Sequence, residues 1–125
     1  MKSVSIIIPN WNGERQLKKN LPLLFNVLAK FNGESEVIII DDQSEDGSRE
    51  YLKKIRNQKN LRFIFNNKNL GFGGSVNKGV RAARYDLVFL LNTDVEVKTG
   101  CFEHLLPHFE KKDVFAVGAN ADLGQ

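Results

Sequence analysis

Four residues of the sequence could together bind a metal and a phosphorylated ligand, because each stands close behind an apolar stretch. They are Asn10, Asp41, Asp42 and Asp94. Carboxylates gathered on one rim repel one another unless a cation or a donor-rich ligand lies between them. A divalent metal that joins one carboxylate to a diphosphate suits these residue types, with the other oxygens accepting hydrogen bonds from a base and a ribose. Taken singly, each residue could equally end its strand as a turn residue.

The stretches in front of these residues have the character of buried strands. Residues 87–91 form an uninterrupted apolar run that ends at Asn92, and residues 37–40 are all β-branched. Such runs are typical of strands covered on both faces, as in a parallel sheet between helices. In the commonest doubly wound order, 3-2-1-4, the first and fourth strands are neighbours where the strand order reverses. The polar residues would then line one crevice.

Segments with helical periodicity separate these strands along the chain. The expected strands are residues 4–8, 37–40, 61–65, 87–91 and 114–117. Their alternation with helices predicts an α/β fold with a doubly wound, mostly parallel open sheet and helices on both faces. No helix is expected after the fifth strand, so the fold is expected to be truncated there. Pro9 is expected to end the first strand. In the first helix Pro22 predicts a kink, or a restart with Asn20 as the cap, and Asp46 is the expected N-cap of the second helix.

The glycine-rich segment, residues 66–79, does not follow the common phosphate-binding patterns. It lacks the GK[ST] ending of a P-loop, and Val76 occupies the place of the third glycine in GxGxxG. Two interpretations stay open, a backbone cradle for the ligand or a loop that needs positive φ at several positions. The second half of the segment is expected to be a helix, in which Gly79 lets the backbone approach the sheet closely.

One tryptophan and two histidines give weaker signals. Trp11 could be an aromatic platform for a base or a sugar, or it could pack in the core. His104 and His108 lie one helical turn apart, but their amphipathic segment favours a solvated face. A metal site at these histidines would need further ligands supplied by the fold.

The composition excludes several classes of protein. Of the 125 residues, 42% are apolar and 26% charged, which is ordinary for a soluble globular protein, and we expect one domain over residues 1–125. A single cysteine, Cys101, excludes an internal disulfide. No apolar run has the form of a signal peptide or approaches the roughly 18 residues of a membrane helix. The net charge of +3 is spread along the chain, so nucleic acid is not an expected partner.

Four motifs, in this order and spacing, carry a resemblance: VSIIIPNWNG, IIIDDQSEDGS, NLGFGGSVNKG and LVFLLNTDVEV. The chain resembles the nucleotide-binding half of family 2 glycosyltransferases, which have the Rossmann-like GT-A fold, and is most similar to bacterial rhamnosyltransferase-like members. The resemblance implies transfer of a sugar from a UDP- or dTDP-linked donor to a glycan or lipid-linked acceptor hydroxyl in polysaccharide or glycoconjugate synthesis. The single cysteine favours a reducing, cytosolic context, so we expect a cytoplasmic location, with attachment at the inner membrane face left open.

The resemblance further implies a set of substrate-binding residues. These are Pro9, Asn10, Asp41, Asp42, Gly71, Asn77 and Asn92. Within the set, Pro9 and Asn10 border the nucleoside. Asp42 contacts the pyrimidine base, with Asp41 beside it.

The metal and the catalytic base follow from the same resemblance. Asp94 is the metal-binding acid of a DxD-like motif and would hold Mn²⁺ or Mg²⁺. Asn92 departs from the family pattern, because it replaces the first acid of that motif and leaves one anionic ligand. The base of the inverting reaction lies in the acceptor half of such enzymes, beyond the fifth strand, so no catalytic residue is assigned. Glu96 is the nearest spare acid, but the alternation along DVEV could make it a surface residue.

Two other functions compete with this interpretation. A phosphoacceptor receiver domain also has about five strands and clustered acids, but its acid pair follows the first strand, where this chain has Asn10. A nucleotide-binding module without catalytic activity is the second alternative. Binding of pyrimidine nucleoside diphosphates, compared with binding of acetyl phosphate, separates the donor-binding interpretation from the receiver.

Overall fold

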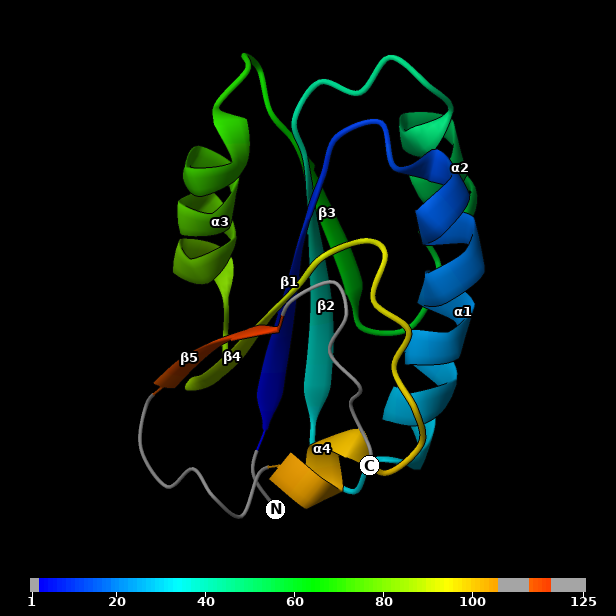
Figure 1. Ribbon diagram of the computed structural model, residues 1–125, viewed down its shortest axis with the longest axis vertical. Coiled ribbons are helices and arrows are strands. Elements are labelled where there is room, and N and C mark those ends of the chain that lie inside the picture. The colour runs from blue at the N-terminus through cyan, green and yellow to red at the C-terminus, as the bar shows by residue number, and fades with distance from the viewer. Residues whose placement is uncertain (1–2, 106–112, 118–125) are drawn as a thin grey trace.

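The centre of the fold is a parallel sheet of five strands, counted over the described residues 3–105 and 113–117 of the computed structural model (Figure 1). The strands are β1 (Val4–Asn10), β2 (Ser35–Asp41), β3 (Leu61–Phe65), β4 (Leu87–Leu91) and β5 (Asp113–Val117). They lie in the order β3-β2-β1-β4-β5, and each neighbouring pair is parallel. The expected order 3-2-1-4 is confirmed, with the strand order reversing between β1 and β4.

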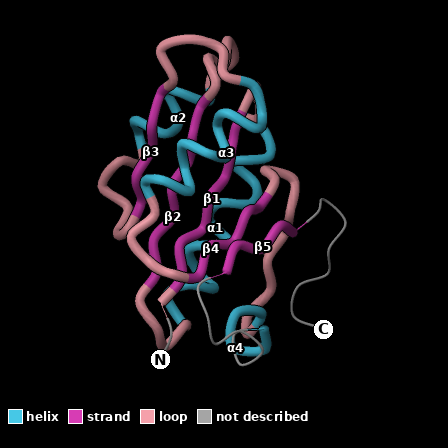
Figure 2. Tube along the Cα trace, turned by 90° about the vertical axis from the view of Figure 1, so that its left-hand side faces the viewer, coloured by secondary structure: helices cyan, strands magenta, loops and turns pink. Residues whose placement is uncertain are grey.

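The helices of the described residues lie on both faces of this sheet. They are α1 (Glu14–Lys30), α2 (Ser48–Lys54), α3 (Gly71–Ala82) and α4 (Cys101–Leu105). Figure 1 shows α1 and α2 on one face and α3 on the other, and Figure 2 shows α3 in front of the strands. This arrangement confirms the predicted doubly wound α/β fold. No helix in the described part of the chain has the length and apolar character of a membrane span.

The larger core lies between the sheet and the layer formed by α1 and α2. Alternate residues of β1, Ile6 and Ile8, belong to it, as the period of a strand requires. Phe102 of α4 stacks on Phe89 of β4 with ring centroids 5.2 Å apart. Phe102 also meets Phe31 in an edge contact at 6.1 Å. The short helix α4 therefore completes the core on the α1 side of the sheet.

The smaller core lies under α3 and confirms the expected role of Gly79. The strand residues Ile7, Ile38, Ile40 and Val88 form this core. A Cβ on Gly79 would lie 2.5 Å from Cγ2 of Ile7 and 2.6 Å from Cδ1 of Ile40, which is closer than any side chain tolerates. The absence of a side chain at this position lets α3 approach the sheet.

A buried carboxylate joins several elements near the amino ends of the strands. Glu36, which is 2% exposed, accepts hydrogen bonds from Ser5 Oγ at 2.7 Å, Arg62 Nη1 at 2.7 Å and the amide of Arg84 at 2.6 Å. Burial alone would raise the pKa of Glu36. The bonds from Arg84, Ser5 and Arg62 outweigh burial and hold the pKa below its usual value. This group ties β1, β2 and β3 to the segment before β4.

Two prolines lie inside elements that continue past them. Helix α1 continues through Pro22, so the restart with Asn20 as a cap is wrong. Pro22 is exposed, and the carbonyl that loses its amide partner can turn to water. Strand β1 continues past Pro9 to Asn10, because its pairing with β4 ends at Ile7 while its pairing with β2 goes on. The missing amide of Pro9 thus interrupts no bond of the β1–β4 ladder.

The glycine-rich segment is more helical than expected. Helix α3 begins at Gly71 and includes most of the segment. Gly71 has a φ of 73°, and it is the only residue of the segment with a positive φ. The interpretation as a loop with several positive φ angles is therefore wrong. Gly79 is explained by its close approach to the sheet, whereas a Cβ at Gly73 would meet no other atom within 4 Å.

Candidate functional site: a hollow at the carboxyl ends of the strands

A hollow of about 380 Å³ lies where β1 and β2 end and α3 begins. Its lining residues are Pro9, Asn10, Trp11, Asp42, Asn69, Gly71, Phe72 and Ser75. Four predicted substrate-binding residues, Pro9, Asn10, Asp42 and Gly71, are thus brought together. Another hollow of equal volume lies near the amino ends of β2 and β3. We choose the first, because open α/β sheets bind ligands outside the carboxyl ends of their strands.

Asp42 is a buried carboxylate in the wall of this hollow. Its side chain accepts three hydrogen bonds at the start of α3: Oδ1 from Asn66 Nδ2 at 3.0 Å and from the Leu70 amide at 2.8 Å, and Oδ2 from the Gly71 amide at 2.9 Å. Burial would raise the pKa of Asp42, but these hydrogen bonds outweigh it and lower the pKa below its usual value. Asp42 therefore carries its charge at neutral pH.

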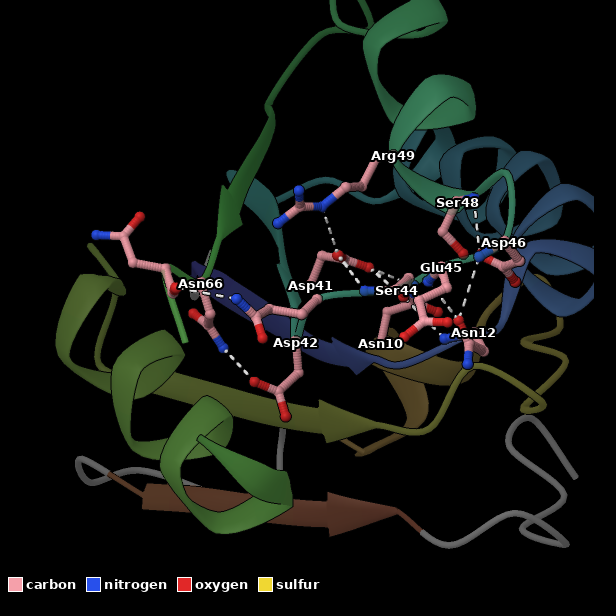
Figure 3. Close-up of polar contacts among 12 residues, drawn as sticks. Asn10, Asn12, Asp41, Asp42, Ser44, Glu45, Asp46, Ser48, Arg49 and Asn66 are labelled. Carbon is pink, nitrogen blue, oxygen red and sulfur yellow. Dashed lines mark hydrogen bonds and ion pairs between the residues drawn. The ribbon is translucent and has the colours of Figure 1, made fainter. Parts of the chain in front are cut away.

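Asp41 lies beside Asp42 in sequence but points another way (Figure 3). Its carboxylate is fully buried and accepts hydrogen bonds from Asn10 Nδ2 at 2.8 Å, Ser44 Oγ at 2.6 Å and Arg49 Nε at 3.1 Å. Asp41 is not among the residues that line the hollow. Its contacts give it a supporting position, because it holds Asn10 and the segment after β2 in place.

The loop after β1 is tied to the loop after β2 on both sides of Trp11. Before Trp11, Asn10 is bound to Asp41. After it, the amide of Asn12 donates to Ser44 Oγ at 2.8 Å, and Oδ1 of Asn12 accepts from the amide of Glu45 at 2.7 Å. Trp11 itself is 64% exposed, so the core-packing alternative for this residue is wrong. Its exposed ring is carried by a well-anchored backbone.

Two carboxylates, one at the start of α1 and one just before α2, each cap the other helix. Oδ2 of Asp46 accepts from the amide of Glu14 at 3.0 Å, and Oε1 of Glu14 accepts from the amide of Gly47 at 2.8 Å. Each acid thus satisfies a backbone donor at the start of the other helix. The predicted cap is displaced by one residue: Gly47 is the N-cap of α2, while Asp46 Oδ1 accepts from the Ser48 amide at 2.9 Å.

Asp94 and Asn92 lie in the turn after β4, apart from the lining of the hollow. Asp94 is exposed and Asn92 is half-buried. The amide of Val95 donates to the carbonyl of Asn92 at 3.1 Å, which closes the turn. Asn77 is exposed on α3 and also lies outside the lining. The structure does not bring these three residues into the hollow with Asp42.

The donor set fits a metal only if a ligand supplies most of the coordination. Among the described residues, no three histidine, cysteine or acidic side chains gather where they could hold an ion. Asp94 offers one exposed carboxylate, and Mg²⁺ is commonly bound by one or two carboxylates together with substrate phosphates and water. The side chain of His104 and all of His108 lie outside the described residues, so the histidine pair is not tested.

Several residues of the site were missed by the sequence analysis. Ser44 joins Asp41 to the Trp11 loop, and Asn66 joins Asp42 to Ser75 through a hydrogen bond of 3.1 Å. Phe72, which is 59% exposed, lines the hollow together with Trp11. Asn66 had a signal in the sequence, since it follows β3 as Asn10 and the acids follow their strands. Ser44 and Phe72 had no comparable signal.

Comparison with known proteins matches residues 5–123 to the Glycosyl transferase family 2 model. An uncharacterized glycosyltransferase from Nostoc is 31% identical over 122 residues, which cover 96% of this chain and 37% of the relative. The poly-beta-1,6-N-acetyl-D-glucosamine synthase of Staphylococcus aureus is 26% identical over 110 residues, which cover 88% of this chain and 26% of the synthase. The chain spans well under half the length of these curated relatives.

Solved structures share the fold. TarS 1–349 of S. aureus, in complex with UDP-GlcNAc, has a TM-score of 0.73 and 27% identity, and the match covers 83% of this chain and 30% of TarS. A mannosyltransferase from Pyrobaculum calidifontis, in complex with GDP-Man and Mn²⁺, has a TM-score of 0.67 at 19% identity, covering 74% of this chain and 28% of that protein. The second likeness supports the fold alone.

These findings exclude the receiver interpretation. The acid pair lies at the end of β2, and the end of β1 carries the buried amide of Asn10. The expected GT-A arrangement of the sheet is present, and the family match extends over nearly all of the sequence. The chain belongs to glycosyl transferase family 2.

Proposed function

We propose that this chain binds the nucleoside diphosphate of a sugar donor and forms the donor side of an enzyme that transfers the sugar to an acceptor hydroxyl. The observation that supports this proposal most is the hollow lined by both the buried carboxylate of Asp42 and the exposed side chain of Trp11. Sites for small molecules commonly combine apolar walls with a few fixed polar groups. The family and the complex of TarS with UDP-GlcNAc support a nucleotide sugar as the donor.

The base of the nucleotide is proposed to lie between the aromatic side chains and Asp42. Oδ2 of Asp42 accepts one hydrogen bond, from Gly71, and can accept another. The ring N–H of uracil or thymine is a donor that suits this oxygen. Trp11 and Phe72 supply exposed rings on which a base can stack. A UDP- or dTDP-linked sugar is therefore the proposed donor class.

The anchored loops reduce the cost of binding. Asn10 and Asn12 fix the backbone on both sides of Trp11, through Asp41 and Ser44. A ring held in place before the ligand arrives loses less conformational freedom when the complex forms. Asp41 contributes to binding in this indirect way, as a support for the wall of the hollow.

Asp94 is the residue that we propose to hold Mg²⁺ or Mn²⁺ at the diphosphate. Its exposed carboxylate would be the single anionic ligand supplied by the described residues, with Asn92 nearby as a neutral one. When bound, such an ion offsets the negative charge of the leaving diphosphate.

The acceptor and the location belong to the same proposal. A glycan or lipid-linked hydroxyl is the proposed acceptor, because one relative is a poly-beta-1,6-N-acetyl-D-glucosamine synthase. The proposed product is therefore a polysaccharide or glycoconjugate. A cytoplasmic location stays a prediction from the sequence, and no residue of the chain is assigned as the catalytic base.

Isothermal titration calorimetry with free nucleotides tests the proposed function. UDP and dTDP should bind and release heat, GDP and ADP should bind more weakly, and acetyl phosphate should give no signal. Equal affinity for UDP and for ADP, whose base has no ring N–H to donate, would contradict the role given to Asp42. Failure of all four nucleotides to bind the folded chain would overturn the proposal.

A further inference from the structure

Asn20 is an amide in an unfavourable place, the buried interior of α1. It is 8% exposed and lies well inside the helix, which runs from Glu14 to Lys30. Asparagine disfavours helix interiors, because its side chain competes for backbone hydrogen bonds. Leu17, Leu21 and Leu24 surround it on the buried face of the helix. An apolar residue at position 20 would suit the helix better.

The amide of Asn20 makes one long-range contact. Its Nδ2 donates to the carbonyl of Thr93 at 2.8 Å, across 73 positions of the sequence. Thr93 stands between Asn92 and Asp94, so the bond joins α1 to the centre of the DxD-like turn. The other polar atom of the same amide, Oδ1, is buried and has no hydrogen-bond partner among the described residues. A buried acceptor without a partner is costly, so stability alone does not explain the residue.

The packing around this bond also fixes the turn. Asn20, Asn92, Thr93 and Val95 enclose a space of only about 10 Å³ together with apolar residues of α1 and β4. On the other side, a Cβ at Gly13 would lie 3.2 Å from Oγ1 of Thr93. Thr93 is therefore hydrogen-bonded to α1 and lies beside the loop that precedes this helix. Asp94, the next residue, is exposed beyond this fixed point.

We propose that Asn20 is a positioning residue for Asp94. By holding the carbonyl of Thr93, it sets the direction in which the carboxylate of Asp94 leaves the turn. The inference rests on the proposed function, in which Asp94 binds a divalent ion at the diphosphate. The buried amide of Asn20 thereby fixes the turn that carries Asp94, although it destabilises α1.

The test compares Asn20→Leu with Val27→Ala. Leucine has the same branched shape as asparagine, is somewhat larger, and removes both the bond to Thr93 and the unpaired oxygen. Val27 is buried two turns further along the same face of α1 and contributes to the core. Its truncation weakens the core without touching the turn. Asn20→Ala serves as a second variant if leucine does not fit.

Binding of UDP is measured with and without Mn²⁺ for all three variants and the wild type. We expect Mn²⁺ to tighten binding in the wild type and in Val27→Ala. In the Asn20 variants this enhancement should fall about fivefold or more, the lower end of typical couplings between ligands, while metal-free affinity stays close to wild type. An enhancement equal to that of the wild type in Asn20→Leu would overturn the inference.

Hydrogen exchange of the free protein gives a readout without metal or nucleotide. The amide of Val95, which donates to Asn92 across the turn, should exchange faster in the Asn20 variants and not in Val27→Ala. Unchanged exchange at this amide would also overturn the inference. Absence of any Mn²⁺ enhancement in the wild type would refute the metal role of Asp94 and this inference with it. Metal-free binding of UDP tests the proposed function separately.

Discussion

Replacing Asp42 by alanine should weaken both the fold and nucleotide binding. The change removes hydrogen bonds from Asn66, Leu70 and Gly71. A hydrogen bond to a charged group contributes about 1.5 to 3 kcal/mol, but the two backbone amides can reach water and Asn66 keeps its bond to Ser75. We therefore expect the free energy of unfolding to fall by about 2 to 4 kcal/mol, well below the sum of three such bonds. Urea denaturation measures this loss.

The binding effect of Asp42→Ala is separated from its stability effect by a neighbour. Asp41→Ala should destabilise the fold by a similar or larger amount, because it leaves buried Asn10 and the guanidinium of Arg49 without their carboxylate. Since Asp41 does not line the hollow, its loss should change UDP affinity in the folded fraction by less than about threefold. Asp42→Ala should reduce that affinity about tenfold or more.

Calorimetric titration with UDP, corrected for the folded fraction from circular dichroism, decides between the two acids. Equal losses of affinity in both variants would refute the distinction between a ligand-binding acid and a supporting one. An Asp42→Ala protein that is destabilised but binds UDP as well as the wild type would make Asp42 a structural residue only.

Three further predictions test other parts of the structure. The fold lowers the pKa of Glu36, so its carboxylate stabilises the protein above pH 4.5, the pKa of the unfolded state. This stabilisation should be lost as the pH falls through the lower pKa of the folded state. Midpoints of urea unfolding that stay constant from pH 7 to pH 3 would contradict it. Gly79→Ala should lower the free energy of unfolding by about 1 to 3 kcal/mol, because the new Cβ pushes α3 from the sheet. Gly73→Ala places its Cβ in open space, so it should leave that free energy unchanged or raise it by up to about 1 kcal/mol. A thermal melt in which Gly79→Ala is the more stable variant would disprove the packing. Asp94→Asn should abolish the tightening of UDP binding by Mn²⁺ and leave metal-free binding intact. Glu96→Gln, at an exposed neighbouring residue, should keep the Mn²⁺ enhancement. Equal enhancement in both variants would show that Asp94 only ends its strand.

The strands were predictable because the sequence separates them clearly, and their order is the commonest one in doubly wound sheets. Apolar runs without alternation, such as residues 37–40 and 87–91, belong to strands covered on both faces, and the segments between them have helical spacing. The positions of Asn10 and Asp42 at the edge of one hollow followed from that topology. Gly79 was also predictable, since a glycine beside the apolar face of a helix indicates close packing.

The direction of each side chain was not predictable in the same way. Asp41 and Asp42 are adjacent acids, yet one supports the loops and the other lines the hollow, because successive residues at a strand end point to opposite sides. The role of Asn20 depends on a contact with Thr93 that no local pattern reveals. Its place as a helix cap was inferred from Pro22, whose solvent-exposed position lets the helix continue.

Fluorescence titration of Trp11 with UDP tests the central claim most directly. Trp11 is the only tryptophan of the sequence and lies exposed at the hollow, so its emission reports on this site alone. The proposed stacking predicts a saturable change in emission, with the same Kd that calorimetry gives. Calorimetric binding without any change in the emission of Trp11 would contradict the placement of the base in this hollow.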